Sequence, residues 1–231
     1  MKKLKKWCSK QLDIYRGVDF PIDRIIGKSF VPASRLPHRQ LLERFEAFGR
    51  DGFDWKETAY FNRIAGGTGL PNGGFETLPE GLDFSPSWWL MPWAWYPGKE
   101  RAHDYKTQER RALQKTAAFL DLYESIKNDG YKMRVGGAIR GYILEHPDHG
   151  FIFSQIDGHH RLAILDFLSE MKQSANLEVR VFPIKVIRRS EVLRQPECLR
   201  GLGCNIFSER DALKLFDHPF HQLGFETGKS I

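Results

Sequence analysis

The chain has 231 residues, and its contents of 41% hydrophobic and 28% charged residues are ordinary for a globular protein with a buried core. Three cysteines are too few, and odd in number, for a disulfide framework, so we expect a reduced, cytoplasmic location. The longest apolar stretch, residues 88–97, is about half a membrane span and holds two prolines. The lysine-rich start leads into no apolar run, so we expect neither a transmembrane helix nor a secretory signal.

The net charge of +6 is concentrated near the N-terminus. Residues 1–50 hold 12 of the 35 Lys and Arg residues but only 5 of the 29 Asp and Glu residues, which leaves the rest of the chain near neutrality. A duplex-binding core is usually basic itself, because phosphate neutralisation supplies most of its affinity. Nucleic acid is therefore the less favoured partner. The basic start is interpreted as a solvated tail, with peripheral membrane contact left open.

Composition divides the chain into an N-terminal accessory region over residues 1–104, a regular core over 105–192, and a C-terminal helical extension over 193–231. The first zone is rich in proline, glycine and aromatic residues. Its apolar spacing predicts one helix over residues 39–48, with positions 41, 42, 45 and 48 on the buried face.

Four tryptophans gather in this first zone: Trp88, Trp89, Trp93 and Trp95. We interpret them as a buried aromatic plug between the N-terminal zone and the core, because large aromatic residues mostly pack inward. A sugar-stacking platform, a lid over a nucleotide and a membrane-interface patch stay open as alternatives.

The later zones have regular periodicity. The pattern predicts a helix that ends at 128–130 and a hairpin of strands over 138–144 and 151–156. The next predicted helix buries one face, formed by Leu162, Ile164, Leu165, Leu168 and Met171. A strand over 179–187 follows, which Pro183 places at an edge or bulge, and a last helix is capped by Ser208.

The most informative motif is the Asp157-Gly158-His159-His160-Arg161 turn between the second hairpin strand and the next helix. The first N–H groups of a helix have no internal partner, and the helix dipole adds about half a positive charge there. A glycine lets a ligand approach the backbone, and an arginine fork suits phosphate oxygens. The turn therefore predicts an anion site, with phosphate as its ligand.

The order of helix, hairpin, Asp-Gly-His-His-Arg turn, helix and strand resembles the ParB/sulfiredoxin-like superfamily. Residues 122–130 and 154–165 carry the resemblance, which covers the core zone and not the rest of the chain. The amino-acid sequence of the turn is most similar to that of the free-serine kinase branch. His159 stands where a sulfiredoxin has its catalytic cysteine, so reduction of sulfinic acid is not expected. Residues 208–217 are similar to ParB-like proteins of surface-polysaccharide gene clusters.

The resemblance implies an α/β (α+β) fold, in which a mixed sheet with flanking helices binds nucleotide phosphates at this turn. It also implies ATP or ADP with Mg²⁺ as the cofactor. Gly158, His159, His160 and Arg161 would then contact the phosphates, and Arg161 would also stabilise charge on a transferring phosphoryl group. Asp157 either caps the helix or helps to hold the Mg²⁺ ion.

A kinase needs a base that positions the acceptor hydroxyl. The serine kinases use a glutamate ahead of the first core helix, which makes Glu100 and Glu109 candidates, and His160 is a candidate for proton transfer. An ordinary exposed helix glutamate is the alternative interpretation of Glu100 and Glu109.

Two histidine pairs, His146/His149 and His218/His221, have spacings that metal sites use. A proline lies between the members of each pair and no cysteine or acidic cluster joins them in the sequence, so zinc is not expected at either pair.

The sequence thus predicts a nucleotide-phosphate-binding protein, and a phosphotransferase that acts on a small hydroxylated metabolite, in surface polysaccharide biosynthesis. A ParB-like nucleic-acid-binding or nuclease protein and a non-catalytic nucleotide-sensing module are the alternatives.

Overall fold

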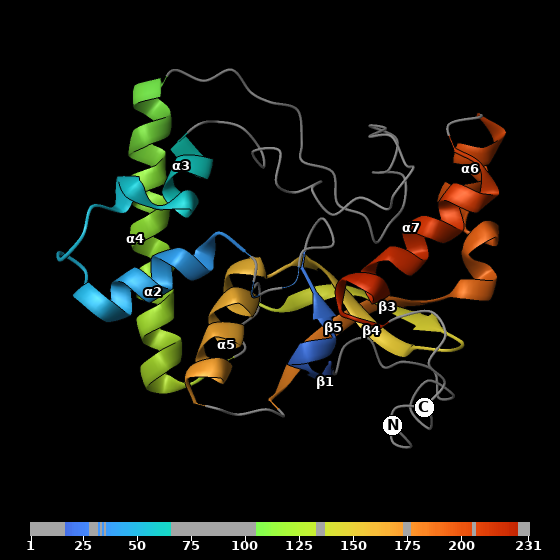
Figure 1. The fold of residues 1–231 in the computed structure, drawn as a ribbon, viewed down its shortest axis with the longest axis horizontal. Helices are drawn as coiled ribbons and strands as arrows, with labels where there is room; N and C mark the ends of the chain where they lie inside the picture. The colour runs from blue at the N-terminus through green and yellow to red at the C-terminus, as the bar shows by residue number, and fades with distance from the viewer. Residues whose placement is uncertain are drawn as a thin grey trace.

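A computed structural model describes residues 17–27, 32, 34, 36–65, 105–132, 137–172, 177–204 and 207–225. These residues form a mixed α/β fold around a five-stranded sheet (Figure 1). The strands are β1 (Val18–Pro21), β2 (Ile25–Ile26), β3 (Ile139–His146), β4 (Gly150–Asp157) and β5 (Glu178–Arg188). The α-helices are α2 (His38–Phe48), α3 (Ala59–Ala65), α4 (Tyr105–Asp129), α5 (His159–Met171), α6 (Pro196–Gly203) and α7 (Glu209–Gln222). Short 3₁₀ helices are η1 (Ile22–Arg24), η4 (Trp55–Glu57) and η7 (Arg189–Arg194).

The sheet is mixed, with the strand order β1-β5-β3-β4-β2. The central β3 runs antiparallel to β4 and parallel to β5. At the two edges, β1 pairs with β5 in antiparallel fashion and β2 pairs with β4 in parallel. The predicted hairpin is therefore confirmed as β3 and β4, and its register places His146 opposite Gly150.

The prediction for Pro183 is also confirmed. Gly141 pairs with Pro183 and the next residue of β3 pairs with Lys185, so β5 holds one extra residue at a bulge. On the other side of β5, β1 pairs no further than Val181. Pro183 therefore lies where its missing N–H group interrupts no regular ladder.

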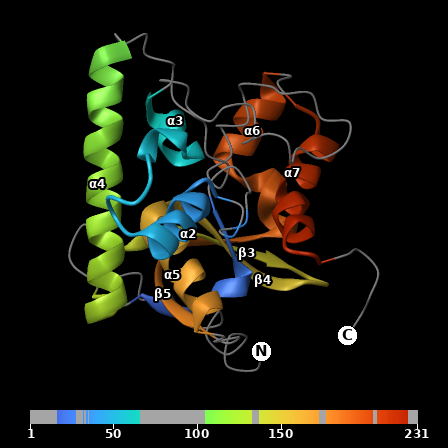
Figure 2. The same cartoon turned by 60° about the vertical axis from the view of Figure 1, so that its left-hand side comes forward.

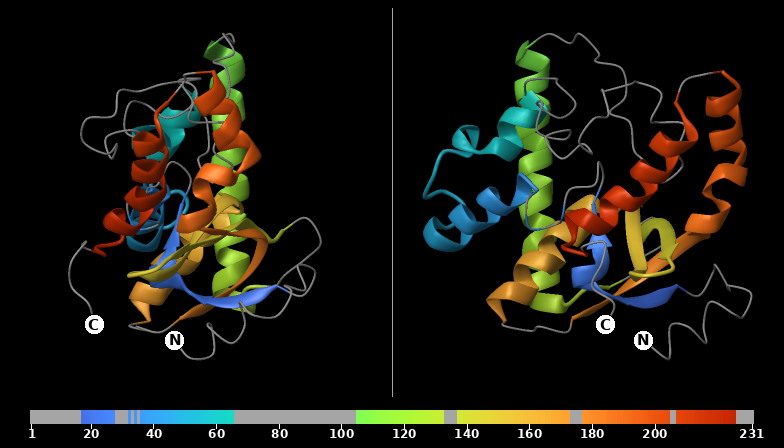
Figure 3. Two further views of the ribbon diagram at one scale, coloured as in Figure 1. Left: turned by 90° about the vertical axis from the view of Figure 1, so that its right-hand side faces the viewer. Right: turned by 45° about the vertical axis from the view of Figure 1, so that its right-hand side comes forward.

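Two apolar cores cover opposite faces of the sheet, because neighbouring residues of a strand point to opposite sides. On one face, Ile143 and Phe153 pack with residues of α2, α4 and α5. On the other, Leu144 and Ile152 pack with residues of α6 and α7. Figure 3 shows this layered arrangement, with α2, α3 and α4 on one side of the sheet and α6 and α7 on the other.

The zone boundaries expected from composition do not divide the sheet. Strands β1 and β2 come from the N-terminal zone and pair directly with strands of the core. The C-terminal helix α7 supplies Leu215, Phe216 and Phe220 to the second apolar core. These parts of the N- and C-terminal zones therefore belong to the same folding unit as residues 105–192, since apolar burial on both sheet faces depends on them.

Most helix predictions are confirmed. Helix α4 ends where Gly130 takes a positive φ of 77° and its N–H donates to the Ile126 carbonyl, and Ser208 forms a capping box with Asp211 at the start of α7. Two residues predicted on buried helix faces are instead exposed. Phe48 is 63% exposed and Met171 is 50% exposed, because each lies at the end of its helix beyond the packed turns. None of the helices in the described ranges is long and apolar enough to cross a membrane.

Candidate functional site

The site is built where β4 leads into α5. Gly158 separates the two elements with a φ of +85°, and a Cβ atom there would lie 2.9 Å from both the Ala138 carbonyl oxygen and the Ile139 Cα atom. Only glycine meets both demands, because L-residues avoid this backbone region and the start of β3 leaves no room for a side chain. The sharp turn places the first residues of α5 beside the start of α2.

Of the two alternatives expected for Asp157, a helix cap or a Mg²⁺ ligand, the structure does not show the cap. The N-cap is Gly158, and no side chain caps α5. Asp157 is exposed, and its Oδ1 atom accepts a hydrogen bond of 2.8 Å from the Gly158 N–H group, one position ahead of the helix. The helix dipole and the N–H groups of the first turn, from His159 to Arg161, therefore have no side-chain cap to compensate them.

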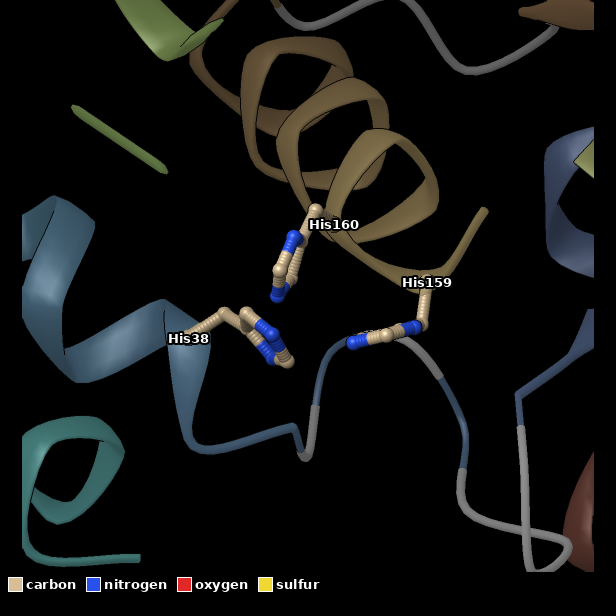
Figure 4. Close-up of side chains that lie close together, drawn as sticks. All are labelled: His38, His159 and His160. Atoms are coloured by element: carbon tan, nitrogen blue, oxygen red, sulfur yellow. The ribbon is translucent and has the colours of Figure 1, made fainter. Parts of the chain in front are cut away.

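Three histidines gather over this helix start. His159 and His160 come from the first turn of α5, and His38 is the first residue of α2. One ring nitrogen of each lies within 4.8 Å of the others. Ring centroids are 4.2 Å apart for His159 and His160, and 5.6 Å and 5.1 Å from His38 to His159 and His160. Figure 4 shows the three rings pointing toward one another from two separate elements.

Burial makes His38 the unusual member of this cluster. Its side chain is 3% exposed, and neither ring nitrogen has a hydrogen-bond partner among the residues that the structure describes. Burial lowers the pKa of His38 well below its ordinary value, and His160, His159 and Arg63 add to this by electrostatic repulsion. His38 is therefore a neutral imidazole at physiological pH.

Aromatic residues hold His160 in place. The Tyr60 hydroxyl of α3 lies 3.1 Å from His160 Nε2, and the Phe119 ring of α4 is 5.2 Å from the His160 ring. Burial raises the pKa of Tyr60, so its hydroxyl keeps its proton and can donate a hydrogen bond to the imidazole. His160, expected as a catalytic residue, is thus packed inside a histidine and aromatic cluster.

Two arginines make the surroundings positive. Arg161 follows the histidines in α5, and Arg63 of α3 interacts electrostatically with both Tyr60 and His38. Burial lowers the pKa of Arg63, and within the described part of the chain no carboxylate lies at ion-pair distance from Arg63 or Arg161. Arg161 therefore adds a positive charge in the first turn of α5, and Arg63 adds one beside His38.

The structure does not bring Glu109 to this region. Glu109 pairs with Lys56 at 2.6 Å. It lies ten residues before Phe119 on α4, which corresponds to about 15 Å along the helix axis. Its expected role as a base at the turn is therefore not supported by its position. Glu100 and the Trp88–Trp95 cluster lie outside the described residues.

The pair His146/His149 lies on a different part of the sheet. The two rings stack with centroids 4.3 Å apart, and His146 Nε2 is 3.5 Å from Asp217 of α7. Arg189 donates to both oxygens of Asp217, at 2.7 and 2.8 Å. This arrangement is an ion-paired contact between η7, α7 and the hairpin.

Sequence reasoning missed His38, Tyr60 and Arg63, which all belong to the N-terminal zone. The only local signal was that His38 immediately precedes the helix predicted over residues 39–48. Nothing in its spacing points to residues 159 and 160, because the packing of α2 and α3 against α4 and α5 creates the contact (Figure 2).

Comparison of the chain with family models, curated proteins and solved structures finds no match. The ParB/sulfiredoxin-like resemblance therefore stays a prediction that residues 122–130 and 154–165 carry.

Proposed function

We propose that the first turn of α5 binds the phosphates of a nucleotide, and that the chain transfers a phosphoryl group to a small hydroxylated metabolite. The observation that carries the proposal is the start of α5 at Gly158 without a side-chain cap, in a region where Arg63 and Arg161 have no described carboxylate partner. A free helix N-terminus beside arginine forks is the arrangement that phosphate oxygens complement.

In this proposal, phosphate oxygens accept hydrogen bonds from the backbone N–H groups of the first turn and from the Arg161 guanidinium. The glycine lets them approach the backbone without meeting a Cβ atom. Asp157 is the carboxylate at the turn, so it could share a Mg²⁺ ion with the phosphates, as Mg²⁺ sites with one or two carboxylates do. ATP or ADP is the proposed donor.

The transfer step forms a bond between the acceptor hydroxyl oxygen and the terminal phosphorus. The bond from that phosphorus to the leaving nucleotide breaks, and the hydroxyl proton passes to a base. Positive charge from Arg161 and the helix N-terminus would stabilise the equatorial oxygens of the transferring group.

The order of α4, β3, β4, the turn, α5 and β5 supports the wider proposal of a ParB/sulfiredoxin-like fold. A cytoplasmic location and a role in surface polysaccharide biosynthesis belong to the same proposal. Two of the cysteines, Cys198 and Cys204, are free thiols, which agrees with a reducing compartment.

Calorimetric titration of the full chain with ATP, ADP and CTP, each with and without Mg²⁺, tests the binding. We expect Arg161→Ala to weaken nucleotide binding at least about tenfold, as the loss of a charge-assisted contact predicts. Arg210→Ala is the matched control, because Arg210 is exposed on α7 at the opposite face of the sheet.

Transfer of the labelled terminal phosphate of ATP and, separately, of ADP to a panel of serine, hexoses and inositol tests the reaction. Binding with no transfer to any acceptor and no hydrolysis would overturn the transferase and leave a nucleotide sensor. Wild-type protein that binds no nucleotide would overturn the phosphate site itself.

A further inference from the structure

We propose that His38, His159 and His160 form a site for one transition-metal ion of the Zn²⁺ class. This proposal goes beyond the phosphate site and does not depend on it, because it uses the ring nitrogens of the three histidines, whereas the proposed phosphate contacts come from backbone N–H groups and Arg161. The cluster is the one set of three or more ligand-type side chains at metal-binding spacing in the part of the chain that the structure describes.

The geometry requires only small movements. The three ligand nitrogens lie within 4.8 Å of one another, and a tetrahedral Zn²⁺ ion with bonds of about 2.0–2.1 Å would hold them about 3.3 Å apart. Figure 4 shows the three rings turned toward one another, so rotation of the half-buried His159 side chain and small shifts of the other two rings can close the gap.

The burial of His38 supplies a second, independent observation. A buried polar nitrogen without a hydrogen bond loses free energy relative to water, and both ring nitrogens of His38 are in this position within the described chain. A bound ion would give one of them a strong partner. Tyr60 and Phe119 pack against the His38 ring, with centroids at 4.7 and 5.1 Å, and fix its orientation.

The ligand types select the ion. Imidazole nitrogen suits Zn²⁺, Co²⁺, Ni²⁺, Cu²⁺ and Fe²⁺, whereas Mg²⁺ prefers oxygen ligands in octahedral geometry. Three protein ligands leave a coordination position open, as in the three-histidine sites of catalytic zinc enzymes. Arg63 and the uncapped start of α5 surround the site with positive charge, so the group in the open position would be an anion or a water that loses its proton.

Titration of the tag-free, chelator-treated full chain with Co²⁺ tests the proposal, because tetrahedral Co²⁺ has intense visible bands and octahedral Co²⁺ does not. We expect one equivalent to bind with tetrahedral bands, and Zn²⁺ to displace it. His38→Gln and His159→Gln should each weaken the affinity about 100-fold or more, as the loss of one of three ligands predicts.

His221→Gln is the matched control, because His221 is exposed on α7 and far from the cluster in the fold. It should bind Co²⁺ like the wild type. His159 is half-buried, so its variant keeps the measurement interpretable if the buried His38 variant does not fold. Wild-type protein with no tetrahedral bands, or equal binding by the wild type and both cluster variants, would overturn the site.

The two proposals fail separately. Arg161→Ala removes no imidazole, so it should keep the Co²⁺ bands while its nucleotide affinity falls. At low metal concentration, His38→Gln should lose the Co²⁺ bands and keep its nucleotide affinity. Loss of Co²⁺ binding in Arg161→Ala with an intact fold would contradict the separation of the two sites.

Discussion

The hydroxyl of Tyr60 lies 3.1 Å from Nε2 of His160 and joins α3 to the first turn of α5 across 100 positions of the chain. This contact ties the N-terminal zone to the candidate site, since the position of the imidazole depends on how α3 packs. It also explains why the site could not be assembled from the Asp157–Arg161 segment alone.

Replacing Tyr60 by phenylalanine tests the energetic value of this contact. We expect Tyr60→Phe to lower the free energy of unfolding by about 0.5–1.5 kcal/mol, because a half-buried hydrogen bond is lost while the ring stays in place. Urea denaturation of the metal-free protein measures the change. Tyr131→Phe is a useful control, since the Tyr131 hydroxyl donates over a longer 3.4 Å to the Gly137 carbonyl and should cost less. Equal costs would contradict the prediction.

Any side chain at position 158 should destabilise the fold. We expect Gly158→Ala to destabilise the fold by about 2–4 kcal/mol, because the positive φ costs about 1–2 kcal/mol and the clash with the start of β3 adds to it. Gly130→Ala separates the two contributions: Gly130 has a similar φ of +77° at the end of α4, but a Cβ atom there would meet nothing within 4 Å. Thermal unfolding compares them, and a Gly130 variant as damaging as the Gly158 variant would show that the clash is unimportant.

Asp166 should make stability depend on pH. Burial raises the pKa of Asp166 to about 6, with repulsion from Glu170 adding to the rise and Arg39 opposing it. The folded state therefore binds the proton more tightly than the unfolded state, so stability is full at low pH and falls as the pH rises from about 4 to about 6. We expect Asp166→Asn to stabilise the protein by about 1–3 kcal/mol at pH 8.

The advantage of Asp166→Asn should shrink toward zero as the pH is lowered to 4, where the wild-type carboxyl is also neutral in the folded state. Chemical denaturation of both proteins at pH 4 and pH 8 measures this difference. A constant advantage at both values would mean that ionisation of Asp166 is not its source.

The ion pair between Arg189 and Asp217 should anchor α7 to the rest of the fold. Asp217 is 17% exposed and accepts two hydrogen bonds from one guanidinium. We expect Asp217→Asn to cost about 1–3 kcal/mol of unfolding free energy, because a half-buried charge-assisted pair loses its charge. Glu191→Gln should cost less than about 1 kcal/mol, because its pair with Arg188 is more exposed. Denaturant unfolding ranks the two.

The sequence predicted correctly those features that depend on the chemistry of a few neighbouring residues. The glycine stop at Gly130, the capping box at Ser208 and the bulge near Pro183 each follow from the backbone chemistry of one or two residues. The cap was one of two alternatives for Asp157 because its residue type favours it, yet Gly158 takes the cap position with a positive φ.

The sequence by itself determined α2, the end of α4, the hairpin, α5, β5 and the start of α7, and it predicted an anion-binding turn, because periodicity and turn chemistry act over a few neighbouring residues. Only the tertiary structure decided what stands opposite that turn. In the fold Glu109 pairs with Lys56, whereas His38 and Tyr60 lie beside His160, and Arg63 lies near His38. The physical reason is that helix packing on a sheet face depends on shape and burial across the whole core, which no short segment encodes.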